Sequence, residues 1–260
     1  MISAILRAMP FIQTPSHKIF YSHNRVQSAT DVILIHGAGG SHLHWPGELR
    51  RLKTISCYAI DLPGHHKSPL PGCQTLEGYA TAVTEFIKEK ELQSVILLGH
   101  SMGGAISQLL AVGQPDWLSG LILIGTAPKM PVSPAILEQI HTDFPSMADF
   151  ITKYGWAKDT QALLKGMGRK MLLEEEPDVV FHDFNACNNF NVKEKVAQIT
   201  MPTLIIGGEQ DRMTPLKQSY FLHAQIEDSQ LAIVEGAGHF MALEQPREVT
   251  RVVTKFLAQF

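Results

Sequence analysis

The stretch Val95-Ile-Leu-Leu-Gly99-His100-Ser101-Met102-Gly103-Gly104 decides the fold of this 260-residue chain. An apolar run leads into Gly99, and Ala105–Val112 continues with helical character. A G-x-S-x-G sequence between a strand and a helix predicts a tight turn that holds the serine in a strained backbone conformation. Residues two before and two after the serine must then lack a side chain, and Gly99 and Gly103 meet that need. The weaker interpretation is a glycine-rich turn in which Ser101 has no chemical role.

Outside this stretch, short apolar runs alternate with longer segments of helical period, which is typical of a parallel sheet covered by helices. The runs interpreted as strands are Val32–Ile35, Ile55–Ile60, Val95–Leu98, Leu121–Ile124, Thr203–Ile206 and Leu231–Val234. Helical segments are expected at 75–90, 102–113, 215–226 and 246–259. An additional antiparallel strand is expected at Lys18–Ser22, ahead of the others. The predicted fold class is therefore α/β, with a mostly parallel, doubly wound sheet.

The alternation is interrupted once, between Ile124 and Thr203. That part of the chain contains Pro128, Pro131, Pro134 and Pro145, two segments of helical spacing (Phe150–Trp156 and Ala162–Leu173) and the aromatic residues Trp156, Phe181, Phe184 and Phe190. It is too aromatic for a disordered linker. We interpret residues 131–195 as a helical cap inserted into a core domain formed by residues 1–130 and 196–260. Such a cap is expected over the carboxyl ends of the strands, where sheets of this type bind ligands.

A nucleophilic serine requires a base, and the base requires an acid that orients it. His239 follows the last predicted strand within Glu235-Gly-Ala-Gly-His, so it is expected at the same edge of the sheet as Ser101. The acid should follow a neighbouring strand, and Asp211 lies in the loop after Thr203–Ile206. Glu209 in the same loop is the rival, unless it is only a solvated charge of the turn. The predicted catalytic residues are Ser101, His239 and Asp211.

Backbone N–H groups are predicted to stabilise an oxyanion beside Ser101. The first predicted parallel strand runs into His36-Gly-Ala-Gly-Gly-Ser41, a glycine-rich bend that can expose an N–H group toward the serine. Met102 opens the helix after Ser101, where N–H groups are free and the helix dipole favours negative charge. Ala38 N–H and Met102 N–H are the expected donors. A dinucleotide-binding G-x-G-x-x-G is excluded because His42 stands at the last glycine position.

Several histidines raise the question of a metal site. His42 and His44 lie on the glycine-rich bend, and His65 and His66 lie in the turn Asp61-Leu-Pro-Gly-His-His-Lys-Ser68. Their spacing matches no recognised zinc motif, so a structural turn is the preferred interpretation and neither metal nor cofactor is expected.

Composition excludes several classes of function. The chain carries 22 Lys and Arg against 25 Asp and Glu, with no basic run, so nucleic-acid binding has no electrostatic support. Its three cysteines are widely spaced, which fits reduced thiols better than a disulfide framework. The first 15 residues lack the features of a signal peptide, and no uncharged apolar stretch is long enough to span a membrane. The sequence therefore predicts a soluble, cytoplasmic protein.

The order Ser101, Asp211, His239, with His36-Gly-Ala-Gly-Gly40 upstream, resembles the α/β-hydrolase superfamily, in the branch of small cytosolic esterases, enol-lactonases and meta-cleavage-product hydrolases. The resemblance spans about Ile19 to Phe260 and implies the α/β-hydrolase fold with a Ser-His-Asp triad. It implies no particular substrate.

Two motifs refine the resemblance. Asp61–His65 is similar to the family's D-x-x-G-x-G-x-S turn, but His66 stands where glycine is usual. The elbow differs from the G-N-S-x-G-G of many carbon–carbon bond hydrolases, whereas Asp211-Arg212 is similar to their acid motif. We therefore expect hydrolysis of a small ester or lactone through an acyl-enzyme ahead of carbon–carbon cleavage. The same triad could also support haloperoxidase or acyltransferase chemistry, and a protein of this fold could bind a ligand without catalysis. The oligomeric state is left open.

Overall fold

A sheet of eight strands forms the centre of the molecule, in the order β1-β2-β4-β3-β5-β6-β7-β8. The computed structural model describes residues 10–260, so most of the N-terminal segment in which no signal peptide was predicted lies outside the described residues. The strands are β1 (Phe11–Gln13), β2 (Lys18–His23), β3 (Asp31–Ile35), β4 (Ser56–Ile60), β5 (Val95–His100), β6 (Leu118–Ile124), β7 (Thr203–Gly208) and β8 (Ser229–Val234). Strands β3 to β8 are parallel, whereas β1 and β2 are antiparallel. The predicted α/β class and the antiparallel strand at Lys18 are confirmed.

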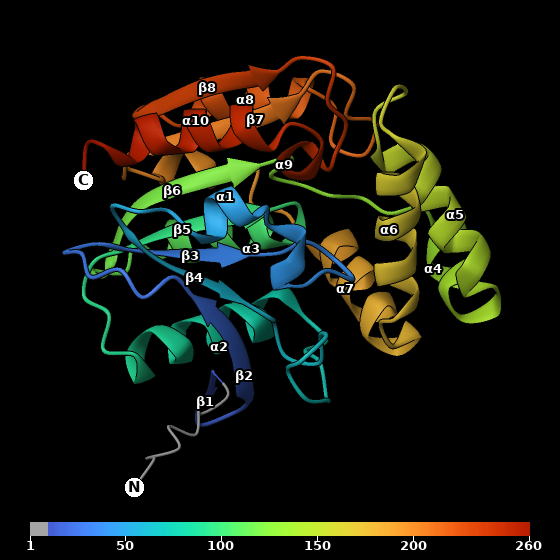
Figure 1. Cartoon of the computed structure of the whole chain (residues 1–260), viewed down its shortest axis with the longest axis horizontal. Coiled ribbons are helices and arrows are strands. Elements are labelled where there is room, and N and C mark those ends of the chain that lie inside the picture. Colours follow the sequence, from blue (N-terminus) through green and yellow to red (C-terminus); the bar gives the residue numbers. More distant parts are fainter. Residues whose placement is uncertain (1–9) are drawn as a thin grey trace, which may run out of the picture.

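Helices cover both faces of the sheet (Figure 1). Alternate residues of one strand point to opposite faces, so Ile33 and Ile35 belong to one apolar core and Val32 and Leu34 to the other. The first core contains side chains of α2 (Leu76–Glu89), α3 (Met102–Val112) and α8 (Lys217–Gln225), and the second contains those of α1 (Gly47–Arg50) and α10 (Pro246–Leu257). Burial on both faces explains why these strands are apolar without alternation.

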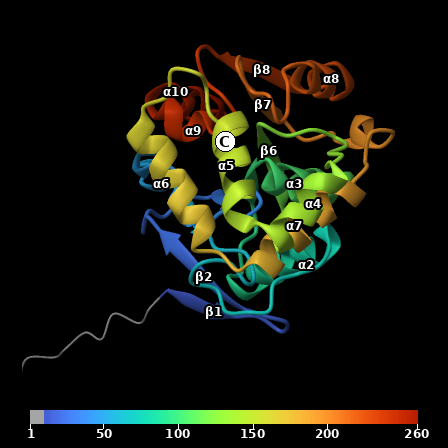
Figure 2. The same ribbon diagram turned by 90° about the vertical axis from the view of Figure 1, so that its right-hand side faces the viewer.

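Four further helices lie between β6 and β7: α4 (Pro134–Thr142), α5 (Phe144–Gly155), α6 (Ala162–Leu173) and α7 (Pro177–Asn189). They stand beyond the carboxyl ends of the parallel strands (Figures 1 and 2). Buried residues that include Ile140, Met147, Leu172 and Val180 form a separate apolar cluster among them. We keep the name cap for residues 131–195; its treatment as a separate unit remains a proposal.

Three cap helices differ from the sequence expectation for a common reason, which is proline. Helices α4 and α7 were not predicted, and each has proline at its first residue, Pro134 and Pro177. Helix α5 begins at Phe144, ahead of the predicted Phe150, with Pro145 in its first turn and Asp143 accepting a hydrogen bond from Ser146 N–H. Proline suits the first turn of a helix because the N–H it lacks would have no partner there.

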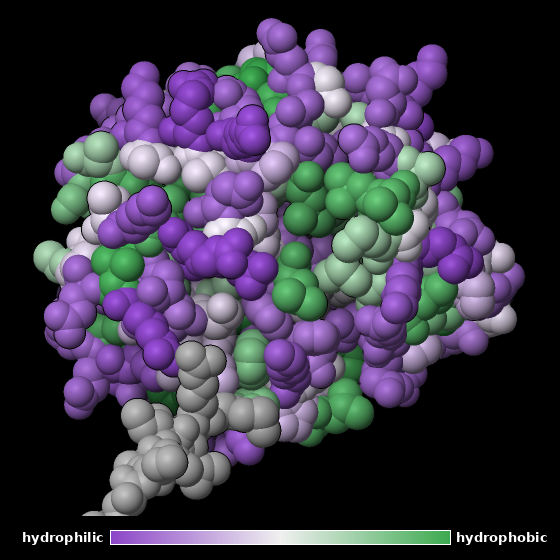
Figure 3. Space-filling view, in the orientation of Figure 1, coloured by the Kyte–Doolittle hydropathy of each residue, from purple (hydrophilic) through white to green (hydrophobic). Residues whose placement is uncertain are grey.

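The surface is mostly hydrophilic on the face shown in Figure 3, with small hydrophobic patches between polar side chains. Within residues 10–260, no helix has the length and apolar character needed to cross a membrane. The remaining short elements are α9 (Met241–Glu244) and the 3-10 turns η1 (His42–His44) and η2 (Val196–Gln198).

Candidate active site

Ser101 lies at the sharp turn between β5 and α3, as predicted from the elbow sequence. Its backbone has φ 51° and ψ −114°, a conformation that a residue with a side chain adopts at a cost of about 1–3 kcal/mol. The turn is held by hydrogen bonds from Ser101 N–H to Ile124 O at 2.9 Å and from Thr126 Oγ1 to Ser101 O at 2.9 Å. These two hydrogen bonds therefore hold Ser101 at the carboxyl edge of the sheet.

The glycines of the elbow are required by close packing. A Cβ atom on Gly99 would collide with the Gly103 carbonyl, and one on Gly103 would collide with the Ile35 carbonyl of β3. A Cβ on Gly104 would lie 2.6 Å from Cβ of Thr126. Two glycines therefore flank the serine because backbone occupies their side-chain space, and a third lets α3 approach the sheet.

Asp211 and His239 form a buried hydrogen-bonded pair. Asp211 follows β7 and His239 follows β8, and Asp211 Oδ2 lies 2.9 Å from His239 Nδ1. Thr214 Oγ1 donates to the same Oδ2 at 2.7 Å, and the Met213 and Thr214 N–H groups donate to Oδ1, each at 2.8 Å. Burial alone would raise the pKa of the Asp211 carboxyl, but the nearby His239 and these hydrogen bonds lower it. The carboxylate therefore stays ionised and orients Nδ1, which leaves Nε2 free to act as a base.

Glu209, the rival acid, has a different environment. Its carboxylate is exposed and accepts a hydrogen bond from Gly236 N–H at 2.9 Å, so it links the loop after β7 to the loop after β8. No hydrogen bond joins it to His239 in the part of the chain that the structure describes. The geometry thus favours Asp211 as the partner of His239.

Two hydrogen bonds to the carbonyl oxygen of Gly37 fix the orientation of the Gly37–Ala38 peptide. Gly37 O accepts from Gly40 N–H at 3.1 Å and lies 2.8 Å from His36 Nδ1. His36 Nε2 accepts from Leu62 N–H, so Nδ1 carries the proton and donates to Gly37 O. Because the peptide is planar and trans, Ala38 N–H points away from that anchored carbonyl. Neither Ala38 N–H nor Met102 N–H donates to another described residue, which fits their predicted role as oxyanion donors.

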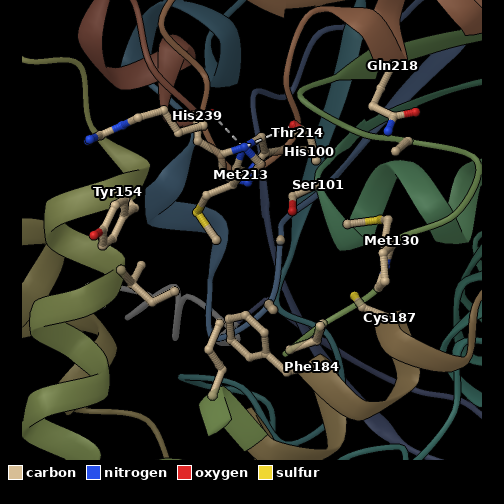
Figure 4. A pocket seen from close by; sticks show the side chains of 18 of the residues that line it. His100, Ser101, Met130, Tyr154, Phe184, Cys187, Met213, Thr214, Gln218 and His239 are labelled. Atoms are coloured by element: carbon tan, nitrogen blue, oxygen red, sulfur yellow. Dashed lines mark hydrogen bonds between the residues drawn. The ribbon is translucent and has the colours of Figure 1, made fainter. Parts of the chain in front are cut away.

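A cavity of about 370 Å³ brings these groups together. Ser101, His239 and His100 line it (Figure 4), and Ala38 lines it together with apolar residues of the core and cap. The apolar residues include Met130, Val132, Ile136, Phe150, Ile151, Phe184, Met213 and Phe240. Ser101 Oγ makes no hydrogen bond within the described residues; such contacts often tighten only when substrate binds.

Two other histidines of the cavity are held neutral. His100 Nε2 donates to His239 O at 2.9 Å, which helps to hold the backbone of His239 in place. Burial lowers the pKa of His100 to about 3, with a further contribution from His239, and burial lowers the pKa of His44 to about 4. Both rings therefore stay uncharged near neutral pH.

The four histidines considered as metal ligands do not converge. His44 faces the cavity and His65 contacts Asp183, whereas His42, Asp61 and His66 offer ligand atoms within 4.8 Å of one another. Asp61 Oδ1 already accepts from His42 N–H at 2.6 Å and lies 2.8 Å from His42 Nδ1. These contacts show that Asp61 ties the turn after β4 to η1. His66, at the position where glycine is usual, has φ 45°, so the turn keeps the backbone that glycine would adopt.

We expect activity to fall as pH drops and to survive chelators. Protonated His239 cannot accept the serine proton, so kcat/KM should fall as pH drops, while His44 and His100 do not titrate near neutral pH. The measurement is a pH profile of kcat/KM with and without EDTA. Complete loss in EDTA, reversed by zinc, would contradict this expectation and revive a metal role for the histidines.

Some supporting residues were not predicted from the sequence. Thr214, His100 and His36 hold Asp211, His239 and the Ala38 peptide, and their partners became apparent only from the fold. His100 and Thr214 are adjacent or nearly adjacent to predicted site residues, so scanning polar neighbours of the triad would have found them.

Comparisons with known proteins agree with this geometry. A model described as "Alpha/beta hydrolase family" matches residues 32–252. The chain belongs to the α/β hydrolase family. A solved structure of a thermophilic esterase shares 30% identity with it at a TM-score of 0.86, covering 96% of each chain.

Two curated relatives are also similar over most of their length. The pimeloyl-[acyl-carrier protein] methyl ester esterase of Yersinia enterocolitica is 25% identical, covering 88% of this chain and 93% of the relative. The 2-hydroxy-6-oxononadienedioate/2-hydroxy-6-oxononatrienedioate hydrolase of a Pseudomonas species is 26% identical, covering 88% of both. The resemblance to the α/β-hydrolase superfamily is confirmed, with esterase and meta-cleavage hydrolase relatives, and the chain is a hydrolase of this family.

Proposed function

We propose that this hydrolase cleaves a carboxylic ester or lactone of a small, partly apolar substrate through an acyl-enzyme on Ser101. The observation that carries the proposal is the buried Asp211–His239 pair at the cavity in which Ser101 stands on a strained elbow. The names of the esterase relatives support ester chemistry in particular.

Acylation uses the groups in the following order. His239 Nε2 takes the hydroxyl proton while Ser101 Oγ attacks the substrate carbonyl, and the negative charge that develops on the carbonyl oxygen is stabilised by the N–H groups of Ala38 and Met102. Asp211 stabilises the imidazolium that forms. The tetrahedral intermediate collapses when His239 returns the proton to the leaving alkoxide, which departs as the alcohol.

Deacylation repeats the sequence with water. His239 removes a proton from water, the hydroxide attacks the acyl carbon, and the same N–H groups stabilise the second oxyanion. Collapse breaks the bond to Ser101 Oγ, which takes back the proton from His239, and the carboxylic acid leaves. In a lactone the alcohol and acid parts remain joined, so one hydroxy acid is released.

The lining of the cavity supports the substrate class. Phe150, Ile151 and Phe184 come from the cap, and Met213 and Phe240 come from the loops that carry the acid and the base. Such a lining favours an apolar acyl group or ring, and the volume of about 370 Å³ fits a small, partly apolar substrate.

We expect the cap to select the substrate without supplying a proton-transfer group. A panel of p-nitrophenyl esters, lactones and dienone acids should give turnover with the esters or lactones. Replacing residues 131–195 with the corresponding segment of a related esterase should shift kcat/KM among ester chain lengths while Ser101 remains reactive. A folded chimera with an unchanged chain-length profile would move the selecting role to the loop after His36.

Carbon–carbon bond hydrolysis is the second candidate because the Pseudomonas relative is named as a hydrolase of 2-hydroxy-6-oxononadienedioate and 2-hydroxy-6-oxononatrienedioate. The elbow has His100 where many such enzymes have asparagine, which ranks it below ester hydrolysis. Turnover of the dienone acids without turnover of any ester or lactone would reverse this order.

A further inference from the structure

A carboxylate from the cap is buried beside the glycine-rich bend after β3. Asp183 lies on α7, its side chain has no exposed surface, and three donors from three different parts of the core surround it. Gly39 N–H and His65 Nε2 approach Oδ2 at 2.8 and 2.7 Å, and the Tyr79 hydroxyl donates to Oδ1 at 2.7 Å. All three donors lie more than 100 positions away in sequence.

His65 beside this carboxylate is an imidazolium. Its Nδ1 lies 3.0 Å from the Pro63 carbonyl and its Nε2 lies 2.7 Å from Asp183, so both ring nitrogens face acceptors and both must carry protons. Burial would lower the pKa of His65, but the Asp183 charge and hydrogen bond outweigh it and raise this pKa to about 9. Asp183 is therefore a charged group with a matched buried partner, and its position is tightly defined.

The cap also packs apolar side chains against this glycine-rich bend. Gly39 has φ 58°, and a Cβ atom there would lie 2.5 Å from Leu172 Cδ1 and 3.4 Å from Val180 Cγ2. These two side chains belong to α6 and α7, so the cap packs directly on the glycine whose N–H it also binds. A role in packing alone would not need a buried charge pair, because apolar groups of similar size commonly replace such pairs without loss of stability.

We propose that Asp183 is a positioning residue of the cap, which fixes the Gly39 N–H and thereby aims the Ala38 N–H at the oxyanion formed on Ser101. The Gly37–Ala38 peptide is anchored on one side by His36, and the Ala38–Gly39 peptide is anchored on the other by Asp183. Ala38 thus lies between two fixed peptide planes, and releasing the second one frees its backbone to rotate. This inference rests on the proposed function.

The test is Asp183→Asn, which keeps the size of the side chain but removes the charge and turns one acceptor into a donor. We expect kcat for a p-nitrophenyl ester to fall roughly 10- to 100-fold with KM changed by less than about 3-fold, because the misplaced donor matters most in the transition state. Asp178→Asn is the matched control: it lies on the same helix with its side chain 86% exposed and should stay within about 2-fold of wild type.

A second readout separates positioning from general loosening. Phenylboronic acid forms a tetrahedral adduct with a catalytic serine and places one oxygen in the oxyanion site, so its Kd should weaken by the same factor as kcat/KM falls. Wild-type kcat in Asp183→Asn, or a rise in KM alone, would overturn the proposal. If Asp183→Asn does not fold, Tyr79→Phe should lower kcat about 2- to 5-fold at constant KM, and an unchanged kcat would overturn the proposal. A wild-type protein that turns over no ester and binds no boronate would instead overturn the proposed function.

Discussion

Ser101→Ala should lower kcat for a preferred ester by roughly 10³-fold or more, equivalent to about 4 kcal/mol of transition-state stabilisation. The hydroxyl is the attacking group, so no covalent intermediate can form without it. The proposed oxyanion donors are backbone N–H groups and remain in place. The variant should therefore still hydrolyse the ester faster than the uncatalysed reaction in water does. The measurement is steady-state kinetics on the best ester of the panel.

The control for Ser101→Ala is a comparison of its fold and stability with those of the wild-type protein. Alanine fits the elbow as well as serine because Ser101 Oγ makes no hydrogen bond among the described residues, so circular dichroism and thermal unfolding should match wild type. A variant that folds normally and keeps more than about a tenth of the wild-type kcat would remove Ser101 from the mechanism.

Asp211→Asn should be nearly as damaging, with kcat lowered roughly 10³- to 10⁴-fold. The carboxylate accepts from His239 Nδ1 and from Thr214 Oγ1 through the same oxygen. An amide at that position would turn an NH₂ group toward His239 or force a rearrangement, and either outcome favours the wrong imidazole tautomer. It would also remove the charge that stabilises the imidazolium.

Glu209→Gln is the matched comparison for Asp211→Asn, since it makes the same chemical change, carboxylate to amide, in the same loop. Glu209 Oε2 accepts only from Gly236 N–H among the described residues, and glutamine can keep that bond, so kcat should change by less than about 3-fold. If Glu209→Gln proved the more severe of the two, the role of orienting acid would pass to Glu209.

The strands and the elbow could be predicted because their signals are local. Runs such as Val95–Leu98 are apolar in sequence since both faces of the sheet are covered, and the glycines at 99 and 103 report a packing requirement within a few residues. The three-residue strand β1 was missed because so short a run carries no periodicity. Helices α4 and α7 were missed because a proline in the sequence suggests an interruption, although it opens both of them.

The candidate site also contains residues that the sequence predicted and residues that it did not. Ser101, Asp211 and His239 each follow a strand, and the parallel sheet brings the ends of neighbouring strands together, so their proximity was predictable from order alone. Asp183 gave no such signal, because its partners Gly39, His65 and Tyr79 are far away in sequence and meet it only when the cap docks on the core. The packing of the cap is therefore the part of the site that needed the structure.

Covalent labelling tests the role of Ser101 as nucleophile most directly. The protein is treated with a fluorophosphonate, which reacts only with an activated serine, and the modified peptide is identified by mass spectrometry. We expect a single adduct on Ser101, formed more slowly at acidic pH as His239 becomes protonated, and absent from Ser101→Ala. An adduct on another serine, or an active enzyme that resists labelling altogether, would contradict the proposed mechanism.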